Sequence, residues 1–173
     1  MGVFEAIKER RSVRAYTDEA VSDDDVGRLM EAARWAPSAG NLQPWALVVV
    51  KEVETKRKLS SATLNQTHIQ EASAVIVVCA DATRSSRVYG SRGEKLYSLQ
   101  DTAAATQNIL LAAHELGLAT CWVGAFRENE VAEAVKAPRN LRPVAMVAVG
   151  YPAERPVAPQ RRSFNEIVHY GTF

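Results

Sequence analysis

The apolar run at 74–80, A-V-I-V-V-C-A, constrains the fold more than any other segment of the chain. Its residues are β-branched or small and none is charged, which is typical of a strand buried on both faces. Shorter runs at 45–50, 119–123 and 144–149 predict three more strands. Because buried strands need cover on both faces, we expect a mixed α and β structure with helices on each side of a sheet.

Helical periodicity and charge patterns predict helices between these strands. Ser22 is typical of an N-cap, with Asp25 three residues later as a variant of the capping box. Gly117 occupies the position after a helix end where a left-handed residue is common. The polar segment 84–97 contains two glycines and is predicted to be a mobile loop. The predicted helices comprise residues 3–7, 23–36, 51–60, 99–116 and 128–136.

The chain has 173 residues, the length of one ordinary domain, and no linker that would divide it. Prolines at 152, 156 and 159 are incompatible with a central strand. Residues 152–173 are therefore predicted to form an extended C-terminal tail, with a turn at 163–170, that wraps over another surface such as a partner subunit.

Charge and apolar patterning exclude several classes of partner. The 21 Lys and Arg residues nearly balance 20 Asp and Glu residues, and a net charge of +1 argues against general nucleic-acid binding. No apolar run approaches the ~18 residues that span a bilayer, and the N-terminus lacks the apolar core of a signal peptide. Cys79 and Cys121 lie in apolar stretches and are expected to be buried thiols. We therefore expect a cytoplasmic protein without a membrane partner.

The segment 10–14, R-R-S-V-R, sets three guanidinium groups and one hydroxyl within five residues, enough donors to hold a phosphate. A second basic pair, Arg161 and Arg162, lies near the other end of the chain. One interpretation is that the first arginines only complement a helix C-terminus, an effect of about 0.3–1 kcal/mol. The other is that both groups converge on one anion, where each charge-assisted hydrogen bond contributes about 1.5–3 kcal/mol.

The segment 36–45, A-P-S-A-G-N-L-Q-P-W, is neutral, and its small and amide side chains suit the lining of a flat polar ring. Together with 10–14 it indicates a phosphorylated aromatic cofactor. The sequence has no Walker loop and no G-x-G-x-x-G after a strand, which argues against an NTPase or a Rossmann domain. The three histidines lack metal-ligand spacing, so no metal is expected, and no G-x-S-x-G elbow supports a hydrolase.

Six segments, in this order along nearly the whole chain, resemble the FMN-dependent nitroreductase family. They are E-R-R-S-V-R-A-Y at 9–16, A-P-S-A-G-N-L-Q-P-W at 36–45, D-T-A-A-A-T-Q-N-I-L-L-A-A at 101–113, G-L-A-T-C-W-V-G-A-F at 117–126, R-P-V-A-M-V-A-V-G-Y-P at 142–152 and R-R-S-F-N-E-I-V at 161–168. The resemblance implies one α+β domain over 1–173, with a mixed central β-sheet flanked by helices. It also implies an intertwined homodimer, a flavoprotein with FMN at the subunit interface.

The resemblance further implies a set of cofactor-binding residues. By this resemblance Arg10 and Ser12 contact the phosphate and ribityl end, aided by Arg161 or Arg162, and Arg14 approaches the pyrimidine edge of the flavin. The full set is Arg10, Arg11, Ser12, Arg14, Pro37, Ser38, Ala39, Asn41, Asn65, His68, Val123, Gly124, Arg161 and Arg162.

The remaining members of the set are expected around the flavin ring. Pro37, Ser38, Ala39 and Asn41 come from the other subunit and cover the ring. The amide of Asn65 reads the pyrimidine edge, and His68 stands where some family members have lysine. Val123 and Gly124 present backbone groups near flavin N5.

The implied activity is that of an NAD(P)H oxidoreductase. NAD(P)H gives a hydride to flavin N5 and leaves, and a nitroaromatic, quinone or similar acceptor then binds over the same ring. Protons come from solvent, so no catalytic residue is assigned. Two alternatives stay open: a specialised member that performs flavin-dependent oxidation, dehalogenation or flavin breakdown, and a non-catalytic flavin-binding protein.

Overall fold

The computed structural model describes residues 2–64 and 66–173, and within these ranges four strands form one sheet. The strand order is β1 (Trp45–Val50), β2 (Ala74–Asp81), β4 (Leu141–Gly150) and β3 (Ala119–Val123). All four predicted strands are confirmed. The prediction of a mixed sheet is wrong, because all three strand pairings are antiparallel. Local periodicity does not encode strand direction, which depends on the end of the sheet to which each connection returns.

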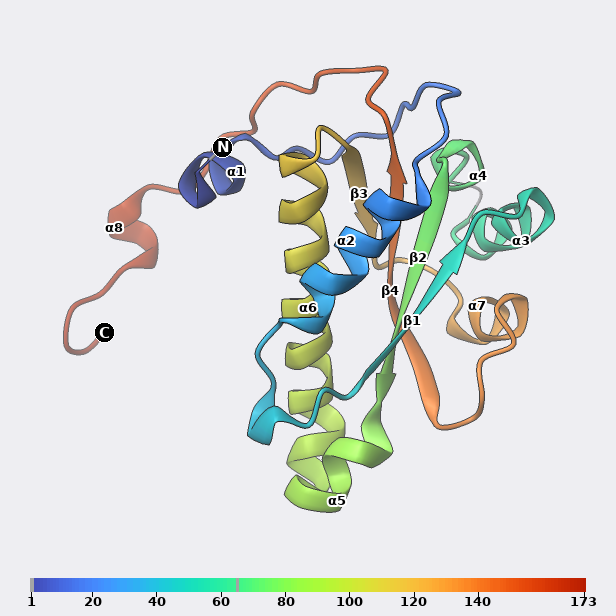
Figure 1. Cartoon of the computed structure of the whole chain (residues 1–173). Helices are drawn as coiled ribbons and strands as arrows, with labels where there is room; N and C mark the ends of the chain where they lie inside the picture. Colours follow the sequence, from blue (N-terminus) through green and yellow to red (C-terminus); the bar gives the residue numbers. More distant parts are fainter. Residues whose placement is uncertain (1, 65) are drawn as a thin grey trace.

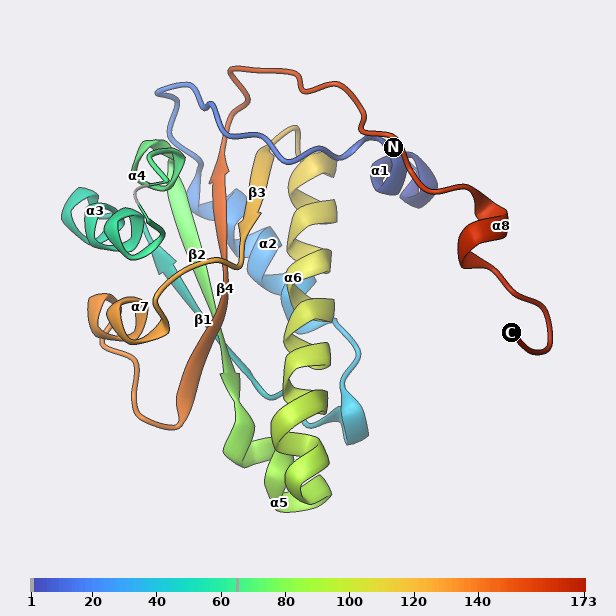
Figure 2. The ribbon, with the colours of Figure 1, turned by 180° about the vertical axis from the view of Figure 1, so that it is seen from behind.

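Helices cover both faces of the sheet (Figures 1 and 2). α2 and α6 lie on one face, and α3, α4 and α7 lie on the other. The helices are α1 (Val3–Glu9), α2 (Asp23–Arg34), α3 (Val53–Ala62), α4 (His68–Glu71), α5 (Ala82–Arg92), α6 (Ser98–Glu115), α7 (Glu128–Ala134) and α8 (Phe164–Ile167), with short turns η1 (Ala39–Asn41) and η2 (Gly93–Tyr97). Every predicted helix is present, whereas the single turn of α4 was not predicted.

Two hydrophobic cores result, one on each face of the sheet. Leu29 and Ile109 pack in the core between the sheet and α2 and α6. Leu59 and Met146 pack in the core beneath α3. Seven residues of β2, Ala74 to Ala80, are buried, which explains why this strand is apolar without alternation.

Local signals explain where several helices begin and end. The Ser22 hydroxyl accepts a hydrogen bond from the Asp25 backbone N–H at 3.0 Å, which confirms the predicted N-cap. Gly117 has a φ of +74°, as predicted for a residue after a helix end. Cys79 and Cys121 are buried and free in the described part of the chain, as expected. No helix in the described ranges is both long and apolar enough to cross a membrane.

Residues 84–97 are helical, so the prediction of a mobile loop is wrong. The segment forms a hairpin of α5 and η2, which we call the α5–η2 hairpin, and Gly90 turns the chain with a φ of +55°. A Cβ atom at Gly93 would lie 2.4 Å from the Ser85 carbonyl oxygen, so glycine is needed where the two arms touch. The glycines therefore serve a tight turn and close packing, and not flexibility.

The two ends of the chain run side by side along one end of the sheet (Figures 1 and 2). The Thr17 N–H donates to the Tyr151 carbonyl at 3.0 Å, and the Ala153 N–H donates to the Ala15 carbonyl at 2.9 Å. Beyond this pairing, α1 and α8 project from the body, and Phe4 and Tyr170 are 79% and 85% exposed. The tail is extended from 153 to 163, in agreement with its prolines.

Candidate functional site

The N-terminal arginines and the C-terminal tail enclose a small cleft with a volume of about 240 Å³. We call it the arginine cleft. Its lining residues are Arg10, Arg11, Ser12, Arg14, Pro156, Val157, Pro159 and Arg161. The structure thus brings basic groups from both ends of the chain together. Arg162 does not line this cleft, and its Nη2 donates to the Glu166 carbonyl at 2.9 Å.

No guanidinium group of the arginine cleft forms an ion pair within the part of the chain that the structure describes. Arg10, Arg14 and Arg161 form no ion pair with any residue that the structure describes. Glu154 is close, but its Oε1 atom accepts hydrogen bonds from the Arg14 and Ala15 backbone N–H groups at 2.6 and 3.2 Å. Uncompensated guanidinium groups in one cleft are typical of an anion site.

The environment of Arg10 is a second observation that fits an anion site. Among the described residues its Nε atom is buried without a hydrogen-bond partner. Burial lowers the pKa of Arg10, and the nearby charges of Arg11 and Arg161 lower it further. Buried polar groups in native proteins are rarely unpaired, so an acceptor from a bound anion fits this position.

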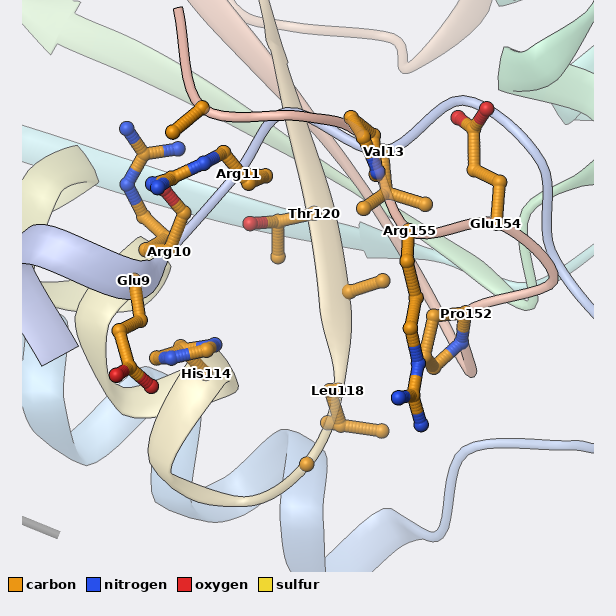
Figure 3. A pocket seen from close by; sticks show the side chains of 14 residues that line it. Glu9, Arg10, Arg11, Val13, His114, Leu118, Thr120, Pro152, Glu154 and Arg155 are labelled. Carbon is orange, nitrogen blue, oxygen red and sulfur yellow. The ribbon is translucent and has the colours of Figure 1, made fainter.

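Arg10 and Arg11 also line a larger cavity of about 540 Å³ (Figure 3). Its wall includes Thr120 of β3, whose carbonyl accepts a hydrogen bond from the Val13 N–H at 3.0 Å. His114, near the end of α6, also lines it, and within the described ranges its Nε2 atom is buried without a partner. Sequence reasoning did not place His114 near the arginines, because only the fold joins the end of α6 to the segment after α1.

His68 feels the charge of Arg14, which lines the arginine cleft. Its side chain is 6% exposed, and its buried Nε2 atom has no hydrogen-bond partner among the described residues. Burial lowers the pKa of His68, and the positive charge of Arg14 lowers it further, whereas Glu71 opposes this effect. His68 is therefore neutral at neutral pH. The predicted Asn65 lies outside the described residues.

Pro37, Ser38, Ala39 and Asn41 lie far from the arginines within one chain. They form the cyan turn beside α5, at the opposite end of the sheet from residues 10–14 (Figures 1 and 2). The Ala39 N–H donates to both carboxylate oxygens of Asp101 on α6, at 3.2 and 3.3 Å. Burial raises the pKa of Asp101. Asp101 was not predicted as a site residue, although it begins the D-T-A-A-A motif.

Val123 and Gly124 stand at the end of β3, which is an edge strand of the sheet. The strand begins beside the arginines, where Ser12 forms a bridge with Thr120. From Thr120 to Gly124 the chain extends about 13 Å at the usual rise per strand residue. The arginine cleft and Gly124 thus lie along the same edge of one chain, whereas the turn η1 lies apart from it.

Comparison with known proteins places the chain in a family. The chain matches the nitroreductase family over residues 7–82 and 60–151. It is 40% identical over 152 residues to an Archaeoglobus fulgidus protein whose name is NADH dehydrogenase/NAD(P)H nitroreductase. The match covers 86% of this chain and 84% of that protein. It is 29% identical over 180 residues to the FMN reductase (NADPH) of Bacillus subtilis, covering 94% and 72%. The solved structure of B. megaterium NfrA2 superposes with a TM-score of 0.93 at 29% identity, covering 100% of this chain and 76% of that one.

Proposed function

Because this chain belongs to the nitroreductase family, we propose that it binds FMN and reduces nitroaromatic or quinone acceptors with electrons from NAD(P)H. The observation that supports the proposal most directly is the arginine cleft. A phosphate monoester carries about −1.5 to −2 charges at neutral pH, and it would neutralise guanidinium groups that have no carboxylate partner among the described residues.

The phosphate end is assigned to the arginine cleft. Arg10, Ser12 and Arg161 would hold the phosphate and ribityl oxygens, and the unpaired Arg10 Nε would gain its acceptor there. Arg161 is favoured over Arg162 because Arg162 already donates to Glu166 and does not line the cleft. The identical charge of the two side chains made this distinction impossible from the sequence.

The ring end is assigned to Arg14, His68 and the end of β3. The charge of Arg14 favours a gain of negative charge at the pyrimidine edge, and a neutral His68 offers a hydrogen bond but no second charge. The backbone at Val123 and Gly124 would border the central ring. The chemistry that FMN supplies when bound is the acceptance of a hydride from NAD(P)H and its transfer to a second substrate that binds in turn.

The site is proposed to be completed by a second copy of the chain. The turn η1 lies at the opposite end of the sheet from the N-terminal segment that carries Arg14 (Figures 1 and 2), so another copy is proposed to supply the η1 that covers the ring. The exposed apolar residues of α1 and α8 also need a surface to cover them. An intertwined homodimer in which η1 of one copy covers the ring of the other meets both requirements.

The test is the visible spectrum of the purified protein with added FMN, followed by anaerobic NADPH or NADH. We expect a yellow protein that bleaches with the donor and recovers its colour with menadione or a nitroaromatic. The double variant Arg10→Ala with Arg14→Ala should lose bound flavin, and Arg161→Ala should weaken it, whereas the control Arg162→Ala should retain it.

Two results would contradict the proposal. A double variant that keeps its full flavin content would remove the arginine cleft from the assignment. A wild-type protein that binds FMN but is not reduced by either donor would be a binding protein and not an oxidoreductase.

A further inference from the structure

We infer that the α5–η2 hairpin binds the 2′-phosphate of NADPH, so that the protein prefers NADPH to NADH; this inference rests on the proposed function. The hairpin carries four exposed basic residues in twelve positions, namely Arg84, Arg87, Arg92 and Lys95. The sequence alone gave this segment no role. It was expected to be a mobile loop, and none of the cofactor residues lies in it.

The basic side chains of the hairpin have no acidic partner in the described part of the chain. None of the four forms an ion pair with a residue in the described ranges, although arginines elsewhere, such as Arg34 and Arg127, do. The hairpin contains one acid, Glu94, which forms no ion pair with a described residue, and Asp81 before it accepts a hydrogen bond from the Arg84 backbone N–H at 3.0 Å and caps the helix. The hairpin therefore presents cations that an anionic ligand can engage without breaking existing ion pairs.

These cations stand on a rigid element. The two arms touch at Gly93 and Ser85, and the rings of Tyr89 and Tyr97 meet edge to face with centroids 5.2 Å apart. The Arg92 Nε donates to the Tyr97 hydroxyl at 2.9 Å, and the Arg92 guanidinium lies over the Tyr97 ring, 5.4 Å from its centroid. Preorganised cations lose less conformational entropy when they bind a phosphate than those of a flexible loop.

The hairpin is attached to the turn that the proposed function places over the flavin. The Arg84 Nε donates to the Leu42 carbonyl, directly after η1. The Tyr89 hydroxyl lies so close to Gly40 that a Cβ atom there would be 2.5 Å from it. A donor that lays its nicotinamide on the ring beside η1 therefore leaves its remaining phosphates within reach of this hairpin.

Charge then separates the two donors. The arginine cleft is assigned to the flavin phosphate, so the donor needs other cations. NADPH differs from NADH by one phosphate monoester, which adds about −1.5 to −2 charges at neutral pH. Cations without an acidic partner favour the more highly charged donor, and because they are exposed to solvent the preference should decline as salt increases.

Arg87 and Lys95 provide the test, because neither side chain makes a hydrogen bond or ion pair with a described residue whose loss would disturb the hairpin. The double variant Arg87→Gln with Lys95→Gln is compared with Arg57→Gln plus Lys58→Gln on α3, which removes the same charge on the other face of the sheet. Stopped-flow flavin reduction gives the apparent Kd of each donor. Calorimetry with adenosine 2′,5′-bisphosphate measures binding without any reaction.

We expect the hairpin variant to bind NADPH and adenosine 2′,5′-bisphosphate at least about tenfold more weakly, as for lost charge-assisted hydrogen bonds. Its Kd for NADH should change less than threefold, and its flavin content should not change. Equal effects on both donors, or equal effects of the α3 control, would overturn the inference. A wild-type flavin that neither donor reduces would refute the proposed function, and calorimetry would still decide whether the hairpin binds the bisphosphate.

Discussion

Replacing Asp101 with alanine tests whether the turn η1 is held in place by a single buried carboxylate. Asp101 is 7% exposed, and both of its oxygens accept from the Ala39 N–H. The variant Asp101→Ala removes this acceptor. We expect the Ala39 amide to exchange with solvent faster and the turn to become less ordered, while the rest of the fold persists.

The magnitude follows from two opposing contributions. A hydrogen bond to a charged acceptor contributes about 1.5–3 kcal/mol, and the variant loses it at η1. However, burial raises the pKa of Asp101, so its ionised form disfavours folding at neutral pH, and alanine removes that cost. The free energy of unfolding should therefore fall by less than the hydrogen bond contributes. The turn η1, in contrast, should lose the whole of that hydrogen bond.

The assay is a fluorescence titration with FMN. If η1 covers the ring, losing the hydrogen bond that holds η1 in place costs about 1.5–3 kcal/mol of binding free energy. FMN binding then weakens by about tenfold to a hundredfold. The matched control is Asp101→Asn, which keeps an oxygen acceptor for the Ala39 N–H and should bind FMN nearly as tightly as the wild type. An Asp101→Ala protein with wild-type FMN affinity and unchanged exchange at Ala39 would refute this role.

Three further predictions concern stability, each measured by urea unfolding. Ile109→Ala should destabilise the protein by about 2–5 kcal/mol, because the side chain is fully buried between α6 and the sheet. Gly93→Ala should reduce the free energy of unfolding by about 1–3 kcal/mol, since its Cβ would lie 2.4 Å from the Ser85 carbonyl oxygen. Gly90→Ala is not a suitable control, because an alanine at the φ of +55° found at Gly90 would itself be strained. Burial lowers the pKa of His68 below 6.5, so stability should be lost as the pH falls below 6.5, and His68→Gln should reduce that loss.

The sequence predicted the strands and most helices because burial leaves a direct trace in it. β2 is apolar at every position from 74 to 80 because both faces of the strand are covered. Ser22 predicts the start of α2 because its hydroxyl caps the helix. The α5–η2 hairpin was missed because glycine has two opposite uses. At Gly93 the missing side chain allows contact with Ser85, and only the fold reveals that contact.

The site was predictable in part for the same reason. Basic residues at both ends of the chain suggested one anion site, and the fold does bring residues 10–14 and Arg161 to one cleft. The choice between Arg161 and Arg162 depends on backbone direction in the tail, which has no periodic pattern. Asp101 was missed because its sequence neighbours place it on an ordinary helix face, and its partner Ala39 is 62 residues away.

The separation of η1 from the arginine cleft has a thermodynamic consequence for assembly. α8 has four residues, and a helix this short has little stability of its own in water. Phe164 and Ile167 on it are more than half exposed, so in the proposed homodimer the second copy both covers α8 and contributes η1 to the ring. A ligand that binds only the complete site must then stabilise the dimer by mass action. We expect FMN to lower the concentration at which the protein dissociates in sedimentation velocity, and Arg10→Ala with Arg14→Ala to abolish this effect. If FMN leaves the dissociation of the wild-type protein unchanged, the flavin site lies within one chain and η1 does not complete it.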